Sequence, residues 1–255
     1  MAVAEDPALR KGRGAEMVKK NDRLPLSKSR RFILSDETPF AIREAYKTAR
    51  TNLVFSLAEN EQKTVVITSC SPSEGKSTNC LNMAITMAET GASVLLIDCD
   101  MRKPVQNSLL RLDNKVGLSS VLGGLVHDVS KVINRNVRIN LDVLTSGPIP
   151  PNPAELISGS KMDELLRLVG SHYDYVFIDT PPANVVTDAF LMNTRTAGII
   201  FVVKEGHTKH EDIRECLQKA KMTNARVLGF IKANCSGKNI KGGLGNRYRY
   251  DYNYS

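Results

Sequence analysis

Short, continuously apolar segments recur along this chain, and most are separated by a segment with helical spacing. Six such segments stand out: TVVITSC (64–70), SVLLIDCD (93–100), LDVLTSG (141–147), YDYVFIDT (173–180), GIIFVVKEG (198–206) and RVLGFIKAN (226–234). Strands that are apolar on both faces belong to a parallel sheet covered by helices on both sides. The sequence therefore predicts an α/β fold with an open, mostly parallel sheet and helices on both faces.

The intervening segments carry helix signals. Apolar residues at helical spacing follow the possible caps Ser35 and Asp36 and predict a helix over about 38–58. Four further segments predict helices: KSTNCLNMAITMAETG, ended by Gly91, SKMDELLRLVGS (160–171), TDAFLMNTR (187–195) and HEDIRECLQKAKMTN (210–224). The two ends of the chain lack an apolar period. We expect a basic flexible arm over 1–34, a domain over 35–235 and a flexible tail over 236–255.

The net charge of +8 is carried by the two ends of the chain. Residues 1–31 have a net charge of +5 and residues 236–255 one of +3, while the segment 32–235 balances to zero. A basic arm can be a solvated leader or can lie near an anionic membrane. Apart from the four residues RYRY at 247–250, neither end interleaves basic and aromatic residues like a strip that stacks on bases, so nucleic acid is not an expected partner.

The cysteines, histidines and apolar runs exclude several classes of protein. The five cysteines are scattered and form no CxxC pair, which argues against a disulfide framework and a zinc site. No apolar run approaches about eighteen residues and no signal-peptide pattern is present, so we expect a cytoplasmic protein without a membrane span. The histidines have no ligand spacing and are expected on the surface: His127, His172, His207 and His210.

The first apolar strand leads into SPSEGKST, which ends like a phosphate-binding loop. In such a loop, N–H groups at a helix N-terminus hold phosphates, a lysine reaches the β- and γ-phosphates, and a hydroxyl holds Mg²⁺. The usual first glycine, five positions before Gly75, is Cys70 here. The position of the motif between an apolar strand and an apolar helix still predicts a nucleotide site. A dinucleotide is disfavoured, because no GxGxxG follows the strand.

Three carboxylates follow predicted strands. Asp98 and Asp100 end the second strand, and Asp179 ends the strand YDYVFIDT. Such an aspartate can cap a helix, but the carboxyl ends of parallel strands also open onto one ligand crevice. Three carboxylates that converge on a phosphate loop predict a Mg²⁺–nucleotide site.

With these motifs the chain resembles the deviant Walker ATPases, which include partition and Min-type ATPases. Within that superfamily it is similar to the bacterial tyrosine kinases of capsule and exopolysaccharide systems. The Walker A, A′ and B motifs of this family resemble SPSEGKST, LLIDCDMR and VFIDTPP, and further signatures resemble SGPIPPNPAELI (146–157) and TDA. The resemblance covers about residues 35–255. Min-type and partition ATPases carry an additional lysine where this chain has Ser71, which favours the kinase branch.

The resemblance implies a protein-tyrosine kinase that uses ATP and Mg²⁺. Lys76, Asp98 and Asp100 would be catalytic, with Asp98 as general base on the tyrosine hydroxyl. Ser77, Asp98 and Asp179 would hold the metal ion, Asp179 through water. The nucleotide-binding residues would be Ser73, Glu74, Gly75, Lys76, Ser77, Thr78, Arg102 and Asn234. Arg102 could equally be a surface charge, and Asn234, placed to touch adenine, could equally be a turn residue.

Four of the seven tyrosines lie within the last eight residues: Tyr248, Tyr250, Tyr252 and Tyr254. The resemblance implies that this cluster is autophosphorylated. The segment EAYKTARTNL resembles the family's oligomerisation motif Glu-x₂-Arg-x₂-Arg, with Glu44, Lys47 and Arg50 in its three places. Lysine in the middle place loses bidentate pairing, which would weaken a ring-shaped homo-oligomer.

The resemblance also implies partners and a location. A membrane-spanning polysaccharide co-polymerase or activator protein would recruit the kinase to the inner face of the cell membrane, and a cognate tyrosine phosphatase would reverse its action. The kinase would regulate capsular or exopolysaccharide synthesis and export. Two other functions remain open: a Min- or partition-like ATPase switch without tyrosine transfer, and a non-catalytic scaffold. Ser71 and the tyrosine cluster argue against the switch.

Overall fold

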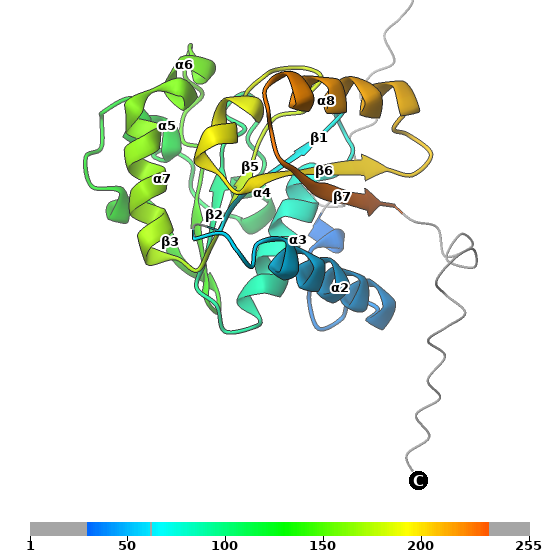
Figure 1. Cartoon of the computed structure of the whole chain (residues 1–255). Helices are drawn as coiled ribbons and strands as arrows, with labels where there is room; N and C mark the ends of the chain where they lie inside the picture. Colours follow the sequence, from blue (N-terminus) through cyan, green and yellow to red (C-terminus); the bar gives the residue numbers. More distant parts are fainter. Residues whose placement is uncertain (1–29, 62, 235–255) are drawn as a thin grey trace, which may run out of the picture.

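A seven-stranded sheet forms the centre of the structure, a computed structural model that describes residues 30–61 and 63–234 (Figure 1). The strand order is β3-β4-β2-β5-β1-β6-β7. The strands are β1 (Thr64–Ser69), β2 (Val94–Asp98), β3 (Ile133–Arg138), β4 (Leu141–Leu144), β5 (Tyr175–Asp179), β6 (Gly198–Lys204) and β7 (Val227–Ala233). All neighbours are parallel except β3, which pairs antiparallel with β4 at the sheet edge. The predicted open, mostly parallel sheet is confirmed.

Helices cover both faces of this sheet (Figure 1). They are α2 (Phe40–Ser56), α3 (Lys76–Ala88), α4 (Gln106–Leu110), α5 (Leu118–Leu122), α6 (Pro153–Ser158), α7 (Ser160–His172) and α8 (His210–Met222), with 3₁₀ turns η2 (Arg30–Phe32), η3 (Val129–Lys131) and η4 (Phe190–Arg195). Within β1, Val65 and Ile67 join the core beneath α2 and α3, whereas Val66 joins the core beneath α5 to α8. This alternation follows from the two-residue period of a strand.

The structure differs from the prediction where the sequence signal is weak. β3, with the sequence INRNVR, was not predicted, because an antiparallel edge strand exposed on one side carries no continuous apolar run. The helix predicted over 187–195 is wrong in type, since η4 is a 3₁₀ turn. η4 lies in the connection from β5 to β6, and 3₁₀ turns are frequent in connections between elements. The short helices α4, α5 and α6 contain too few residues to show a helical period.

Residues 30–34, at the end of the predicted basic arm, pack on the domain. The Nε atom of Arg30 donates to the carbonyl of Ser108 at 3.1 Å. Leu34 is buried, and its N–H donates to Oδ1 of Asn82 at 2.9 Å. The chain is therefore anchored to α3 and α4 before α2 begins.

Two further expectations concern the cysteines and the membrane. The four cysteines in the described part of the chain are buried free thiols: Cys70, Cys80, Cys99 and Cys216. Cys235 lies outside the described residues. Across 30–61 and 63–234, every helix is too short or too polar to cross a bilayer.

The topology brings the predicted motifs to one edge of the sheet. β5 lies between β2 and β1, so the loops after these three strands are neighbours. Asp98, the last residue of β2, pairs in register with Asp179, the last residue of β5. β1 runs directly into the phosphate-loop segment and α3. The carboxylates and the loop therefore meet because parallel strands share their carboxyl edge.

Candidate active site

The segment from Cys70 to Gly75 turns the chain from β1 into α3. Gly75 precedes the helix with a φ of 86°, a left-handed conformation that favours glycine. Ser73 also has a positive φ, of 66°. The first turn of α3 leaves backbone N–H groups without helical partners and carries the positive end of the helix dipole. This turn is therefore suited to hold phosphate groups.

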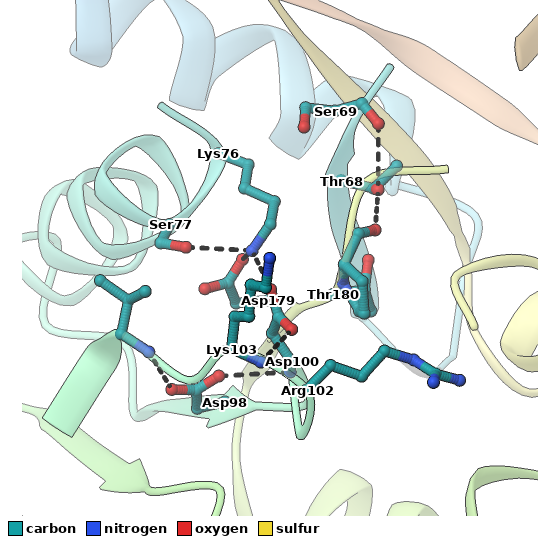
Figure 2. A network of polar contacts seen from close by, with 12 residues as sticks. Thr68, Ser69, Lys76, Ser77, Asp98, Asp100, Arg102, Lys103, Asp179 and Thr180 are labelled. Carbon is teal, nitrogen blue, oxygen red and sulfur yellow. Dashed lines mark hydrogen bonds and ion pairs between the residues drawn. The ribbon is translucent and has the colours of Figure 1, made fainter. Parts of the chain in front are cut away.

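The side chain of Lys76 points from the start of α3 into a group of carboxylates (Figure 2). Its Nζ atom lies 2.8 Å from Oδ2 of Asp100 and 3.2 Å from Oδ1 of Asp179. It also donates to Oγ of Ser77 at 3.1 Å. Burial alone would lower the pKa of Lys76, but Asp179 and Asp100 outweigh it and raise this pKa. The lysine is thus a charged ammonium held among carboxylates.

Asp98 is fully buried at the end of β2. Its carboxylate accepts hydrogen bonds from three backbone N–H groups, those of Asp100 at 3.2 Å, Val105 at 3.1 Å and Gln106 at 3.0 Å. Burial, together with the charge of Asp179, raises the pKa of Asp98 to about 8, although Lys76 and the N–H of Gln106 act in the opposite direction. In the absence of a metal ion, Asp98 therefore binds a proton more readily than an exposed aspartate does.

The two carboxylate oxygens of Asp179 have different partners. Oδ1 faces Lys76, while Oδ2 accepts a hydrogen bond from Nε2 of Gln106 at 2.9 Å. The side chain is fully buried, and burial raises its pKa. The sequence did not identify Gln106, because it begins the five-residue helix α4, where no pattern marks a functional position.

The oxygen ligands available at this edge of the sheet fit Mg²⁺. Mg²⁺ usually takes one or two carboxylates and completes its shell with phosphate oxygens and water. Asp98, Asp179 and the hydroxyl of Ser77 offer such donors, and the ammonium of Lys76 already lies among the carboxylates as a cation. Throughout the described residues, no three His, Cys, Asp or Glu side chains form a complete protein cage for a metal. Phosphate oxygens would have to supply the remaining ligands.

Both carboxylate oxygens of Glu74 form hydrogen bonds within the protein. It is buried, its Oε2 accepts from the N–H of Ser71 at 2.9 Å, and its Oε1 accepts from the hydroxyl of Thr208 at 2.5 Å. Lys204 Nζ lies 3.4 Å from the carbonyl of Ser73. The end of β6 and the segment that follows it therefore contact the loop and stabilise its conformation. Thr208 was missed in the sequence, since a single threonine in a loop carries no signal.

Arg102 binds within the chain. Its Nε and Nη2 atoms donate to the two carboxylate oxygens of Asp188 at 3.1 and 3.2 Å. Asp188, from the TDA segment, is almost completely buried and requires a counter-charge.

Asn234 follows β7 at the sheet edge, is exposed and has a φ of 59°. The structure thus brings together Lys76, Ser77, Asp98, Asp100 and Asp179. Ser73, Glu74 and Gly75 of the loop and Thr78 of α3 lie beside them, whereas Asn234 follows β7, which is two positions from β1 in the sheet.

The three predicted oligomerisation residues differ in their surroundings. Glu44 and Lys47 form an ion pair of 2.8 Å on α2, and their side chains are 43% and 48% exposed. Arg50 instead donates to the carbonyl of Thr86 on α3 at 2.7 Å. The four C-terminal tyrosines lie outside the described residues.

Comparisons with known proteins identify the family of this chain. Residues 62–222 match the AAA domain family. Tyrosine-protein kinase YwqD of Bacillus subtilis is 39% identical over 88% of this chain and 90% of its own length. The kinase domain of the Escherichia coli tyrosine kinase ETK has a TM-score of 0.74 and 28% identity over 88% of this chain and 87% of its own. The chimerical protein CapA2B2 has a TM-score of 0.73 and 36% identity over 77% of this chain and 86% of its own. This chain therefore belongs to the bacterial tyrosine-protein kinases.

Proposed function

We propose that this kinase transfers the γ-phosphate of Mg-ATP to tyrosines of its own C-terminal cluster and thereby regulates capsular or exopolysaccharide synthesis and export. The observation that supports this most is the contact of the Lys76 ammonium with Asp100 and Asp179 beside the phosphate loop. A cation and carboxylates thus lie side by side at the loop where a nucleoside triphosphate would enter. The family membership supplies the reaction class, and the arrangement of these side chains suits it.

The chemistry assigned to each side chain follows from its position. Lys76 exchanges the carboxylates for the β- and γ-phosphates when ATP enters, and the N–H groups of the first turn of α3 bind the same phosphates. Ser77, Asp98 and Asp179 would hold Mg²⁺, which supplies neutralisation of the phosphate charge. The tyrosine oxygen attacks the γ-phosphorus, the bond to the β-phosphate oxygen breaks, and ADP leaves. Asp98 accepts the phenolic proton as general base.

The acceptors in this proposal are Tyr248, Tyr250, Tyr252 and Tyr254. They are supported by the sequence, where a phenol occupies every second position of the C-terminus. About thirteen residues separate Cys235 from Tyr248, and a chain of that length spans at most about 45 Å, so its length permits transfer within one subunit or to a neighbour. We infer transfer to a neighbouring subunit from the family resemblance.

The partners proposed are other copies of this chain and a membrane-spanning activator. Glu44 and Lys47 lie exposed on α2, where a neighbouring subunit can reach them. The activator would be a polysaccharide co-polymerase that recruits the kinase to the inner face of the membrane, and a tyrosine phosphatase would reset the cluster. These partners rest on the resemblance of the motifs described above.

Labelled ATP and purified protein, with and without an activator fragment, test the proposal. Phosphotyrosine in the C-terminal peptide is the expected product, and the Lys76→Met variant should form none. Release of free phosphate alone would instead identify a Min-like ATPase switch, and the absence of both products would indicate a scaffold. For the subunit relationship, a Lys76→Met chain with an intact tail is mixed with an active chain truncated before Tyr248. Label on the inactive chain supports transfer between subunits, and its absence in a confirmed mixed oligomer contradicts it.

A further inference from the structure

Gln106 touches each of the three residues proposed to hold Mg²⁺. Its backbone N–H donates to Oδ2 of Asp98 at 3.0 Å. Its side-chain Nε2 donates to the carbonyl of Ser77 at 2.9 Å and to Oδ2 of Asp179 at 2.9 Å. The residue is fully buried at the start of α4. The neutral side chain of Gln106 therefore joins the end of β5 to the first turn of α3, and its backbone N–H holds the end of β2.

The orientation of this amide is determined by its partners. A backbone carbonyl and an ionised carboxylate both accept hydrogen bonds and cannot donate them. The part of the Gln106 amide that lies between Ser77 and Asp179 must therefore be its NH₂ group. Oε1 then lies on the other side of the amide. Oε1 is buried, and none of the described residues donates a hydrogen bond to it. A buried acceptor without a donor is unfavourable, so a donor is expected to reach it when the site is filled.

We propose that Gln106 is a positioning residue of the metal centre. In this role, its NH₂ group holds the carboxylate of Asp179 in one orientation, and its Oε1 accepts a hydrogen bond from a donor that arrives with the hydrated cation. The inference rests on the proposed Mg-ATP site. Mg²⁺ keeps several of its waters in protein sites, and each such water is a hydrogen-bond donor.

The contacts of Asp179 show why a neutral amide is suited to this task. Oδ1 of Asp179 lies 3.2 Å from the ammonium of Lys76, while Oδ2 is held by Gln106. When Lys76 turns to the phosphates, Asp179 loses the ammonium, but its Oδ2 keeps the hydrogen bond from Gln106. The carboxylate then stays aimed at an incoming cation. A lysine or arginine in place of Gln106 would hold Asp179 equally well, but its positive charge would oppose Mg²⁺.

The experiment measures Mg²⁺ affinity separately from nucleotide affinity. A fluorescent ADP analogue is bound to the full chain, first in EDTA and then with increasing Mg²⁺. Gln106→Met keeps the length of the side chain and removes the donor and the acceptor. We expect this variant to need about tenfold or more Mg²⁺ for half-maximal tightening, as is typical when the partner of a metal ligand is removed. Its affinity for the analogue in EDTA should stay within about twofold of wild type.

The neighbouring residue provides a matched control. Asn107 lies next in α4 and also carries a buried side-chain oxygen without a partner among the described residues. Asn107→Leu should leave the Mg²⁺ requirement unchanged. Gln106→Asn keeps an amide but withdraws it by one methylene, and we expect a loss of several-fold. This smaller change also carries the test if Gln106→Met fails to fold, as judged by its thermal melting curve.

Two outcomes would overturn the inference. In the first, folded Gln106 variants require the same Mg²⁺ concentration as wild type. In the second, affinity falls by the same factor with and without Mg²⁺, which would make Gln106 a residue that shapes the loop only. A wild-type protein that fails to bind the analogue, or whose binding ignores Mg²⁺, would refute the proposed nucleotide site itself.

Discussion

The ammonium of Lys76 lies 2.8 Å from Oδ2 of Asp100, and both side chains are almost completely buried. The lysine that would bind phosphate is therefore already paired before a nucleotide enters. Nucleotide binding must replace this ion pair with contacts between Lys76 and phosphate. The free energy needed to break the ion pair therefore makes the free energy of nucleotide binding less favourable.

The Asp100→Asn variant tests this competition. Without the charge of Asp100, less free energy is needed to move Lys76 from its carboxylate partners to the phosphates. The affinity for ADP in EDTA should therefore rise several-fold. Phosphotransfer should fall, because Asp100 supports the catalytic group. Isothermal titration and a kinase assay measure the two effects. Asp113→Asn, which alters an exposed ion pair with Lys115, is the control and should change neither. Weaker ADP binding in Asp100→Asn would contradict the competition.

The pKa of Asp98 predicts how the stability of the metal-free protein depends on pH. In the folded state this pKa is raised to about 8 by burial and by Asp179, whereas an unfolded aspartate titrates near 3.9. At pH 6 the folded state therefore binds a proton that the unfolded state has lost. Stability must fall as the pH rises from 6 towards 8, by about 1 kcal/mol per pH unit, and level off above it. Asp179, whose pKa burial also raises, acts in the same direction.

Urea unfolding at several pH values in EDTA measures this slope. Lys76 does not contribute in this range, because it is protonated both in the folded state, where its pKa is raised, and in the unfolded state, where lysine titrates near 10.4. The Asp98→Asn variant has no group to titrate at this position, so its slope should be flatter than that of wild type. Equal slopes would show that Asp98 is already ionised in the folded protein at pH 6.

The pair of Arg102 and Asp188 should contribute to stability because one partner is buried. Asp188 is 1% exposed, whereas Arg102 is 37% exposed and partly screened by solvent. Removal of Arg102 leaves an unpaired buried carboxylate, so we expect Arg102→Ala to destabilise the fold by about 2 kcal/mol. A double-mutant cycle with Asp188→Asn measures the coupling. The exposed pair of Lys131 and Asp128 is the control, with an expected coupling below about 1 kcal/mol. A coupling near zero for Arg102 and Asp188 would refute the prediction.

The residues on α2 should separate assembly from stability. Glu44→Ala removes an exposed side chain, so it should reduce oligomers and autophosphorylation without lowering the melting temperature. Arg50→Ala removes the bond to Thr86 and should also lower the melting temperature, because α2 loses a contact with α3. Sedimentation velocity and thermal melting distinguish the two effects. Glu59→Ala, an exposed site beyond the end of α2, is the control. An unchanged sedimentation profile in Glu44→Ala would contradict a role in assembly.

The sequence alone determined the architecture and the reaction class. Apolar strands that alternate with helices require a covered parallel sheet, and a parallel sheet brings the ends of its strands to one edge. The positions of Asp98, Asp179 and the phosphate loop followed from these local patterns. The in-register pairing of Asp98 with Asp179 agrees with that expectation.

Only the tertiary structure decided which partner each side chain meets. Lys76 and Asp179 are separated by 103 residues, and Gln106 and Asp179 by 73. The pairing of Lys76 with Asp100, the inward turn of Glu74 and the bond from Arg50 to α3 are likewise absent from any local pattern. A local pattern reports the period of a strand or helix, whereas a hydrogen-bond partner depends on the packing of distant segments. For that reason Gln106, which joins the metal-holding residues, appears only in the folded chain.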